Sequence, residues 1–433
     1  MSKLIKIGLL GLGTVGSTFV QKLQKSELHP MVAISKILLL NPSKKRNIDT
    51  SSYILTTDPN EILNDPDINI VIELIGGEQP ALNFIIQAIK SQKVVITANK
   101  CVMALHGKQL IELAAQYNTP ILYEASVAGG IPIIRTIMSS LQSITTNSFI
   151  GICNGTTNFI LSQMLSNKVS FQDALKEAQE QGFAEADPIL DIAGIDAAYK
   201  ASILSSLCFK HFQDFSQIHI EGIMDITLTD LEAADHIGYR IKSIIYAKKV
   251  NHVLQVGVFL ALISKNNLLS HIEGVDNLIQ LNSEYLGKTT YIGPGAGGDA
   301  TSTSVISDLI NVINNPTVDL SYYEKCTKSY SYGMVNDIDF NFFITISIEK
   351  DDNMNEEQLN DFKLLYIDEI SSSVRYHHID VNNIFFNSHS IKSQIAHMII
   401  ITGLAKNNEI LRLCENLMKL DKIKSCSHIR MLS

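Results

Sequence analysis

Three glycines close to the start of the sequence constrain the fold more than any other feature. They form a Gly-x-Gly-x-x-Gly pattern between an apolar run over residues 4–10 and an amphipathic stretch over residues 15–24. In this setting one glycine permits the tight turn between strand and helix, another lets the backbone approach a pyrophosphate, and the third allows close helix–strand packing. The helix N-terminus adds free N–H groups for phosphates. We therefore expect this turn to bind a dinucleotide through Gly11, Gly13, Thr14, Val15 and Gly16.

The hydrophobic patterns that follow alternate between strand-like and helix-like spacing. After the first strand, further strands are expected at residues 34–40, 68–74, 93–97 and 121–124. Helices are expected at residues 15–24, 80–91 and 108–117. Alternation of this kind predicts a mostly parallel sheet with right-handed crossovers. The predicted fold class is therefore α/β, with a Rossmann-type doubly wound sheet over residues 1–128 and a segment that returns to it near residues 291–320.

The rest of the chain predicts two further domains. Residues 129–325 read as α+β, with helices at 156–166, 170–181, from near 196 and at 301–313, strands at 255–262 and 277–281, and a loop over 182–194. Residues 338–433 predict strands at 339–348, 373–381, 393–402 and 423–431, and helices at 356–370 and 408–420. This β-α-β-β-α-β order is the ferredoxin-like split motif.

Charge and composition exclude several classes of partner. The formal net charge is −9 and the one basic cluster, Lys44-Lys45-Arg46, is short, so we expect no nucleic-acid partner. No apolar stretch approaches the roughly 20 residues that span a bilayer, so we expect no membrane partner. The six cysteines form no Cys-x-x-Cys pair, which favours a reduced, cytoplasmic protein.

The end of the second expected strand bears on the choice of coenzyme. The acidic residue that usually binds a ribose 2′-hydroxyl there is missing, and the strand runs instead into the basic cluster. Lys44 and Arg46 could pair with a 2′-phosphate, which favours NADP. The same cations could form a solvated loop, so NADP and NAD both remain open.

Acidic residues are concentrated between residues 185 and 196, ahead of Lys200. Asp196 and Lys200 stand four positions apart at the start of an expected helix and share one face. The stretch could be a solvated loop, but the glycines and proline around it indicate a shaped loop. Oxidation of a hydroxyl needs a base, and a lysine can serve when its pKa is lowered. Two lysines near one oxygen would lower each other's pKa, and Lys100 is the natural second lysine.

Four stretches are far more specific than the glycine pattern: residues 97–100, 124–132, 151–161 and 182–200. Together they strongly resemble the homoserine dehydrogenase family, and the resemblance extends over about residues 5–310. It implies interconversion of L-homoserine and L-aspartate 4-semialdehyde by hydride transfer with NADP or NAD, in threonine, methionine and isoleucine biosynthesis. It also implies a homo-oligomer in which the second domain binds the substrate and forms the subunit contact.

The resemblance also implies residue roles. Lys200 would be the general acid/base, and Lys100, next to the cofactor, would polarise the reacting oxygen. The amino-acid substrate would be held by Glu185, Asp191 and Asp196, with its carboxylate near Gly155 and Thr156.

Further roles concern the cofactor and an ion. Gly182 and Gly297 are expected on the cofactor side. A structural sodium ion would be ligated by the family's cation loop, here Glu124, Val127, Gly129 and Ile131. Phe183 departs from the family pattern, which commonly has a tyrosine there, so one substrate hydrogen bond should be lost.

The C-terminal domain resembles an ACT-type regulatory module. Such modules usually bind an amino-acid effector at a turn with proline and glycine, and residues 349–357 contain neither. An amino-acid effector and a purely oligomer-building role both stay open.

Two rival functions follow from the same residues. One is a non-catalytic amino-acid sensor; the other is a different NAD(P) oxidoreductase of amino-acid metabolism that uses a Cys–His pair. Cys101 and Cys153 lie in or beside the matched motifs, but no histidine stands in them, whereas both lysines and the carboxylates are present.

Overall fold

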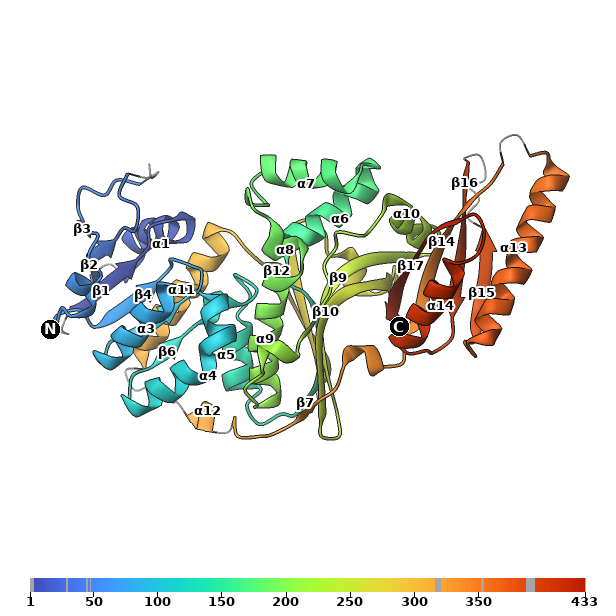
Figure 1. Ribbon diagram of the computed structural model, residues 1–433. Coiled ribbons are helices and arrows are strands. Elements are labelled where there is room, and N and C mark those ends of the chain that lie inside the picture. Colours follow the sequence, from blue (N-terminus) through green and yellow to red (C-terminus); the bar gives the residue numbers. More distant parts are fainter. Residues whose placement is uncertain are drawn as a thin grey trace.

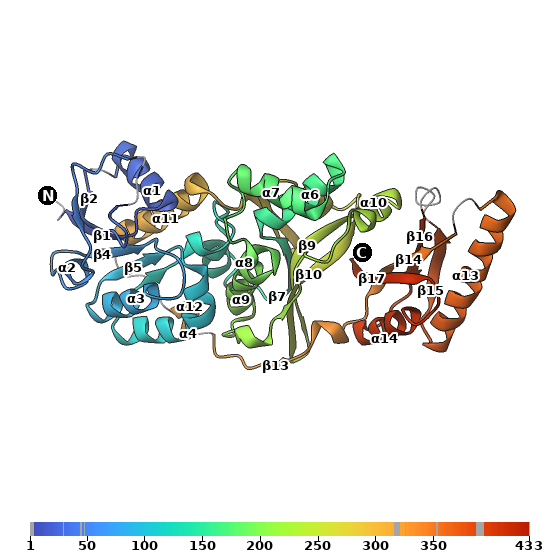
Figure 2. The same cartoon turned by 45° about the horizontal axis from the view of Figure 1, so that its top comes forward.

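The computed structural model describes residues 4–28, 30–43, 46, 48–315, 321–324, 326–351, 354–386 and 394–432. The molecule is elongated, with its N-terminal, middle and C-terminal parts following one another along its length (Figures 1 and 2). In the described part of the chain, no helix is long and apolar enough to cross a membrane.

The first sheet is parallel and doubly wound. Its strands run in the order β3 (Ile54–Thr56), β2 (Val32–Leu38), β1 (Ile5–Leu10), β4 (Ile70–Glu73), β5 (Val94–Thr97) and β6 (Ile121–Leu122). Neighbouring residues of β1 face opposite sides, because Leu9 and Leu10 belong to different cores. One core packs on α1 (Thr14–Lys25) and α11 (Gly298–Asn314), and the other on α3 (Ala81–Lys90) and α4 (Lys100–Gln116). The predicted Rossmann-type sheet is confirmed.

Two features of this part differ from the sequence-based expectation or add to it. The helix expected over 108–117 begins at Lys100, where Asn99 caps it by accepting a hydrogen bond from the Val102 N–H at 3.1 Å. The expectation of a later start was wrong because the cap residue was not recognised. The helix α11 returns from the middle of the chain to pack on α1.

A second, mixed sheet runs through the rest of the molecule (Figure 2). Its first part has the order β12 (Gly287–Pro294), β11 (Asp276–Ser283), β7 (Thr146–Ile152), β9 (Tyr239–Val250) and β10 (Val253–Ser264), and the short strands β8 (His219–Ile220) and β13 (Ser331–Tyr332) pair with β10. The associated helices are α6 (Gly155–Asn167), α7 (Phe171–Glu180), α8 (Ile189–Ile192), α9 (Ile195–Phe209) and α10 (Leu228–His236). Sequence patterns did not predict β7, β9 or α10.

The C-terminal part has the predicted β-α-β-β-α-β order. Its elements are β14 (Asn341–Glu349), α13 (Glu356–Tyr376), β15 (Val381–Phe386), β16 (Ile395–Thr402), α14 (Asn407–Leu417) and β17 (Ile423–Leu432). They form antiparallel strands in the order β17-β14-β16-β15. The last strand also pairs in parallel with β10, through Ala261–Arg430, Leu262–Met431 and Ile263–Leu432, so the sheet continues without a break from the middle of the molecule.

The strand expected over residues 373–381 was wrong. The helix α13 continues to Tyr376, and the strand β15 begins at Val381. Phe362, Tyr366, Ile370 and Val374 stand four positions apart and are all buried on one helix face. Continued burial of that stripe outweighs the weak helix preference of the serines at 371–373.

Candidate active site

The end of β5 and the start of α4 hold Lys100 at the edge of the first sheet. Glu73, fully buried at the end of β4, accepts a hydrogen bond from the Thr97 hydroxyl at 2.6 Å. The Thr97 hydroxyl oxygen accepts one from the Asn99 N–H at 2.9 Å, and the Asn99 side chain donates to the Gly77 carbonyl at 2.7 Å. These contacts fix the first turn of α4, and Lys100 is its first residue. Since the Gly11 turn follows β1 at the same edge, Lys100 lies on the side of the sheet where cofactors bind in this fold.

Lys200 lies on α9 and is 7% exposed. Its Nζ donates to Asp196 Oδ2 at 2.8 Å, one helical turn earlier, and to the carbonyl oxygen of Cys153 at 2.5 Å. Lys100 Nζ forms an ion pair with the other oxygen of the same carboxylate, Asp196 Oδ1. Two amines from distant parts of the chain therefore meet at Asp196, as the assignment of the two lysines required.

The charges at this point set the pKa values of the groups. Burial alone would raise the pKa of Asp196, but the ammonium groups of Lys200 and Lys100 outweigh it and hold that pKa well below its usual range. The Asp196 carboxylate raises the pKa of Lys100, against an opposing effect of burial. The expectation that the two lysines lower each other's pKa is therefore wrong for Lys100, because a shared carboxylate stands between them.

A second carboxylate is tied to the first through Asn154. The Asn154 side-chain amide donates to Asp191 Oδ1 at 2.6 Å and to Asp196 Oδ2 at 2.8 Å. Its carbonyl oxygen accepts the Thr157 N–H at 2.8 Å, so the same residue caps α6. The Thr156 hydroxyl lies within hydrogen-bond distance of two acceptors: Asp191 Oδ2 at 3.0 Å and the Phe183 carbonyl oxygen at 2.7 Å.

Sequence reasoning did not single out Asn154, although it stands in one of the quoted motifs. An asparagine just before an expected helix was the available signal, since this residue type is a preferred N-cap. Gly155 is the first residue of α6, and a Cβ added there would lie 3.2 Å from the Cα of Val275. The first turn of α6 thus lies beside Asp191 through Thr156, and the placement of a substrate carboxylate near Gly155 and Thr156 stays a prediction.

Three expected residues lie on the loop after α7. Gly182 terminates that helix with φ of +78° and is exposed. Glu185 is exposed, and its charge is among those that raise the pKa of Lys100. Phe183, 38% exposed, packs against Phe159 with ring centroids 4.8 Å apart. An apolar ring thus occupies the position of the family's tyrosine.

The dinucleotide turn has the geometry that its glycines predict. Gly11 has φ of +98°, and an added Cβ would lie 2.8 Å from the Leu74 carbonyl oxygen. At Gly16 an added Cβ would collide with the Gly11 carbonyl. Around Gly13, which precedes the first turn of α1 with Thr14 and Val15, an added Cβ would meet nothing within 4 Å. The turn therefore leaves open space at a helix N-terminus, which fits the phosphates of a dinucleotide.

The start of α11 lies beside this turn. A Cβ added at Gly298 would lie 2.5 Å from the Thr18 hydroxyl oxygen and 3.3 Å from the Thr14 methyl group. Gly297, with φ of +98°, immediately precedes this helix, and an added Cβ there would meet nothing within 4 Å. The structure thus brings Gly297 to the same open space as Gly13.

Of the two cations expected near the ribose, Lys44 lies outside the described residues. The Arg46 side chain turns toward the residues that follow β2, and its Nη2 donates to the Asn41 carbonyl at 2.7 Å.

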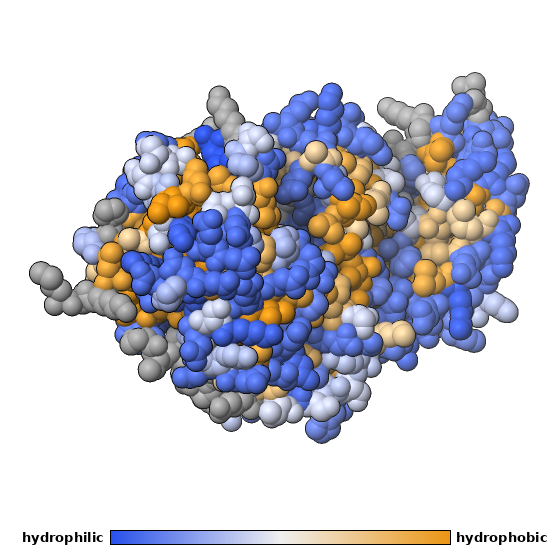
Figure 3. Space-filling view, turned by 60° about the vertical axis from the view of Figure 1, so that its left-hand side comes forward, coloured by the Kyte–Doolittle hydropathy of each residue, from blue (hydrophilic) through white to orange (hydrophobic). Residues whose placement is uncertain are grey.

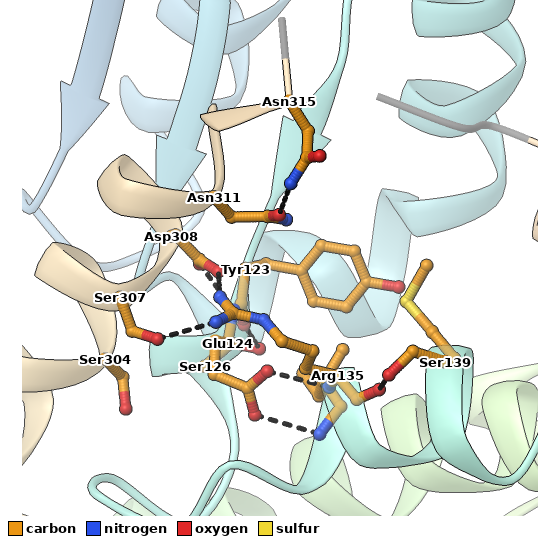
Figure 4. A network of polar contacts seen from close by, with 12 residues as sticks. Tyr123, Glu124, Ser126, Arg135, Ser139, Ser304, Ser307, Asp308, Asn311 and Asn315 are labelled. Atoms are coloured by element: carbon orange, nitrogen blue, oxygen red, sulfur yellow. Dashed lines mark hydrogen bonds and ion pairs between the residues drawn. The ribbon is translucent and has the colours of Figure 1, made fainter. Parts of the chain in front are cut away.

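The predicted ion-binding loop contains a buried carboxylate. Glu124 is 2% exposed, and its two oxygens accept the N–H groups of Ile134 at 2.9 Å and Arg135 at 2.7 Å (Figure 4). Asp308, on α11, accepts the Glu124 N–H at 2.9 Å and pairs with the Arg135 guanidinium at 2.9 Å. Burial, and then the charge of Glu124, raise the pKa of Asp308 to about 7.

The backbone of the same loop is curled. Ala128 and Gly129 have φ of +53° and +52°, and the Gly129 carbonyl accepts the Ser304 hydroxyl at 2.6 Å. Val127 and Ile131 are buried on either side. Carboxylate and backbone carbonyl oxygens are ligands that hard cations prefer, but here both Glu124 oxygens accept backbone N–H groups and the Arg135 guanidinium pairs with Asp308.

The surface around the middle of the molecule is uneven. Figure 3 shows hydrophobic side chains at the surface around a hollow near the centre of that face. Exposed apolar residues of the segment over residues 182–194 include Phe183, Ile189 and Leu190.

Comparisons with known proteins show which family the chain resembles. A family model described as homoserine dehydrogenase matches residues 132–310, and one described as homoserine dehydrogenase, NAD binding domain, matches residues 11–124. A homoserine dehydrogenase of Bacillus subtilis is 40% identical over 342 residues, which are 76% of this chain and 79% of the relative. One of Helicobacter pylori is 40% identical over 72% of this chain and 74% of its own length.

Solved structures extend the similarity to the C-terminal part. The crystal structure of a homoserine dehydrogenase from Thiobacillus denitrificans superposes with a TM-score of 0.88 at 29% identity and covers 100% of this chain and 99% of its own. A Staphylococcus aureus homoserine dehydrogenase structure gives a TM-score of 0.76 at 30% identity, with both chains covered completely.

Proposed function

The chain belongs to the homoserine dehydrogenase family, an NAD(P)-dependent oxidoreductase family, and from this premise we propose how its residues interconvert L-homoserine and L-aspartate 4-semialdehyde. The observation that carries the proposal is the meeting of the Lys100 and Lys200 amines at Asp196. The two rival functions are disfavoured, because a sensor would not need this arrangement and a Cys–His enzyme would use groups other than these lysines.

Lys200 is the general acid/base in this proposal. In the oxidation direction its amine takes the hydroxyl proton of homoserine, and in the reduction direction its ammonium returns a proton to the aldehyde oxygen. Lys100 donates a hydrogen bond to the same oxygen and stabilises the negative charge that develops on it. A bound nicotinamide supplies the hydride acceptor or donor.

Asp196 ties Lys100 to its charged form. Since its carboxylate raises the pKa of Lys100, the ammonium form is favoured at neutral pH. That form suits the role of Lys100 as a hydrogen-bond donor to the reacting oxygen. Oxidation of homoserine releases a proton and should accelerate as the pH rises.

The substrate's own charges match the surrounding residues. We propose that the ammonium group of homoserine binds between Asp191, Asp196 and Glu185, and that its carboxylate lies at the first turn of α6, with Gly155 and Thr156. Asn154 supports this pocket, because its side-chain amide donates hydrogen bonds to both aspartates. The positive end of the α6 helix favours a carboxylate at that position.

The coenzyme occupies the turn of Gly11, Gly13, Thr14, Val15 and Gly16 in this proposal, with Gly297, Gly182 and Lys100 facing it. Arg46, together with Lys44, would receive a 2′-phosphate, so NADP is the proposed preference. Steady-state turnover with NADP and with NAD decides between them, and a lower KM for NAD would contradict this assignment.

The cation proposal uses the loop of Glu124, Val127, Gly129 and Ile131. A sodium ion there would balance the charge left by two buried carboxylates and one guanidinium. Its role would be structural. Thermal unfolding in sodium and in tetramethylammonium salts of equal ionic strength tests it, and equal melting temperatures would contradict it.

Assembly, compartment and domain division are also proposals. We divide the chain into a dinucleotide-binding domain (1–128, with 291–320 returning), a substrate and dimerisation domain (129–325) and an ACT-like domain (338–433). We propose a homo-oligomer through the middle sheet, where a cavity of about 580 Å³ opens beside Tyr246, Gln280 and Phe340. Light scattering would report a monomer if this were wrong. The free state of all six cysteines suits a cytoplasmic enzyme.

Two roles stay proposed for the ACT-like domain: binding of an amino-acid effector, or building of the oligomer. Adding threonine to the assay distinguishes them, since inhibition requires an effector site.

The decisive experiment follows the absorbance of the reduced coenzyme with homoserine as substrate. Lys200→Met and Lys100→Met should each lower kcat/KM by at least about a hundredfold, because proton transfer and charge stabilisation are lost. Lys108→Met is the matched control, since Lys108 lies on the same helix as Lys100 with a 65% exposed side chain. Coenzyme binding without turnover in the unaltered protein would favour a sensor instead.

A further inference from the structure

The final strand of the chain carries a buried arginine. Arg430, on β17, is 2% exposed, and its guanidinium donates to both oxygens of Glu221, at 2.7 and 2.8 Å. It also donates to the side-chain oxygens of Asn336 at 2.8 Å and Asn407 at 3.0 Å, and its carbon lies 4.7 Å from the ring centroid of Phe259. A two-point contact between guanidinium and carboxylate fixes both position and orientation.

The other partner, Glu221, comes from the middle of the molecule. It follows β8, and its N–H donates to the Val258 carbonyl at 2.8 Å. Burial tends to raise the pKa of Glu221, but hydrogen bonds from His219 and Arg430 outweigh it and lower that pKa to about 2. The pair with Arg430 is therefore charged on both sides at neutral pH.

The backbone beside Glu221 packs against the turn between Asp191 and Asp196. The N–H of Ile223 donates to the Ile192 carbonyl at 2.8 Å, and a Cβ added at Gly222 would collide with the same carbonyl. A Cβ added at Gly194 would lie 2.8 Å from the Glu221 carbonyl. Residues 221–223 therefore touch the backbone at 192–194 without intervening side chains.

In the sequence, this contact falls between Asp191 and Asp196, the two aspartates proposed to bind the substrate. Asp191 belongs to α8, and Asp196 to the first turn of α9. The turn between them is the part that rests on residues 221–223. A shift of Glu221 would pass directly to both aspartates, because tight backbone contacts leave no side chain to absorb it.

We propose that Arg430 and Glu221 are positioning residues for the reaction, through which the last strand of the C-terminal domain holds Asp191 and Asp196 in their substrate-binding geometry. This inference rests on the proposed function, because it assigns the two aspartates to homoserine. Neither residue is expected to touch substrate or coenzyme. The pair also provides a physical route by which a change in the C-terminal domain would reach the substrate site.

The test compares Arg430→Gln, Glu221→Gln and the conservative Arg430→Lys in the full-length protein. Loss of the two-point contact between Arg430 and Glu221 should raise KM for homoserine roughly tenfold to a hundredfold, as small misplacements in an active site do. KM for the coenzyme should stay within about twofold of its original value. Arg430→Lys keeps the charge but cannot make the two-point contact, so its KM for homoserine should lie between those of the unaltered protein and the Gln variants.

Ser427→Ala is the matched control. Ser427 lies on the same strand and also crosses to the middle of the molecule, where its hydroxyl donates to Asp230 Oδ1 at 3.0 Å. Asp230 caps α10 and has no part in the substrate loop. Loss of the Ser427 hydroxyl should leave the KM values for homoserine and coenzyme unchanged, even if the melting temperature falls.

Two outcomes would overturn the inference: an unchanged KM for homoserine in folded Gln variants, or an equal rise in the Ser427→Ala protein. If Arg430→Gln does not fold, Glu221→Gln and Arg430→Lys carry the same comparison. Failure of the proposed function is seen separately, because the unaltered protein would then bind coenzyme but not turn over homoserine.

Discussion

Asp196 is the residue on which the chemistry of the two lysines depends. It is buried, it contacts both amines, and it raises the pKa of Lys100. A single carboxylate thereby does two things: it places both amines beside one another, and it keeps Lys100 charged for its proposed hydrogen bond to the reacting oxygen. Charge-assisted hydrogen bonds of this kind are the strong ones in proteins.

Asp196→Asn is expected to separate these effects. Removal of the charge lowers the pKa of Lys100 relative to the unaltered enzyme, so the Lys100 ammonium that stabilises the reacting oxygen should be lost at a lower pH, and kcat/KM should begin to fall at a lower pH on the alkaline side. At neutral pH, kcat/KM should fall about tenfold to a hundredfold, since hydrogen bonds to a charged group are lost. The pH profile of kcat/KM measures both. Asp187→Asn, an exposed position on the same loop, should leave the profile unchanged.

Lys242 is a second buried lysine, away from the reacting groups. It is 3% exposed on β9, and its Nζ donates to Asn158 Oδ1 at 3.0 Å and to the Ile272 carbonyl at 2.5 Å. Burial lowers its pKa to about 8. It joins α6 to the segment before β11, against which Gly155 packs.

This lysine predicts a pH dependence of stability. Between about pH 8 and pH 10.5 the unfolded chain binds the Lys242 proton and the folded protein does not, so the free energy of unfolding rises with pH across that window. Lys242→Met should remove this rise, which amounts to up to about 3 kcal/mol. Denaturant unfolding of both proteins at pH 7.5 and pH 10 measures it. Equal pH dependence in the two would contradict the assignment.

At the scale of elements, the start of α4 matters most. Asn99 caps this helix and also bonds to the Gly77 carbonyl, and Lys100 follows it directly. The backbone position of Lys100, the lysine proposed to act on the reacting oxygen, is thus set by a cap, and its half-exposed side chain pairs with Asp196.

Asn99→Ala should therefore lower activity as well as stability. Loss of the cap should cost about 1 kcal/mol of unfolding free energy, and kcat should fall because the first turn, with Lys100, loosens. Asn355→Ala removes an equivalent cap from α13, where the side chain accepts the Gln358 N–H at 2.8 Å. That control should lose similar stability with kcat unchanged. An unchanged kcat in Asn99→Ala would show that the cap does not position Lys100.

The elements that sequence patterns predicted are those whose signals are local. Five of the six strands of the first sheet, all except β3, follow from hydrophobic spacing together with helices α1 and α3, and the C-terminal order of elements follows from the same rule. Strand β9 was missed because Lys242 stands within it, and the partners that satisfy this amine come from Asn158 and Ile272, distant in sequence. Asn154 was missed for the same reason, since the two aspartates that it joins are 37 and 42 positions away.

At the scale of the whole molecule, the middle and C-terminal parts are held together by one sheet that continues from the first into the second. Through β10 and β17 the two parts share one hydrophobic core, in which Phe259 and Ile263 pack with Phe342 and Ile344. All four side chains are fully buried. The arrangement therefore differs from a regulatory domain joined by a linker, and it explains how the last strand can reach the substrate loop.

A chain that ends at residue 330 is accordingly expected to be unstable. Its β10 would lose a neighbouring strand, and exposure of side chains such as Phe259 and Ile263 would cost about 1.5–3 kcal/mol each. That loss is comparable with the total stability of a typical domain. Calorimetry and light scattering should show a lowered melting temperature and aggregation. Polar replacements at Phe259 and Ile263 in the shortened chain should reduce the aggregation, because the exposed edge is its cause. A soluble shortened chain with the melting temperature and the homoserine KM of the full protein would contradict both the shared core and the role given to Arg430.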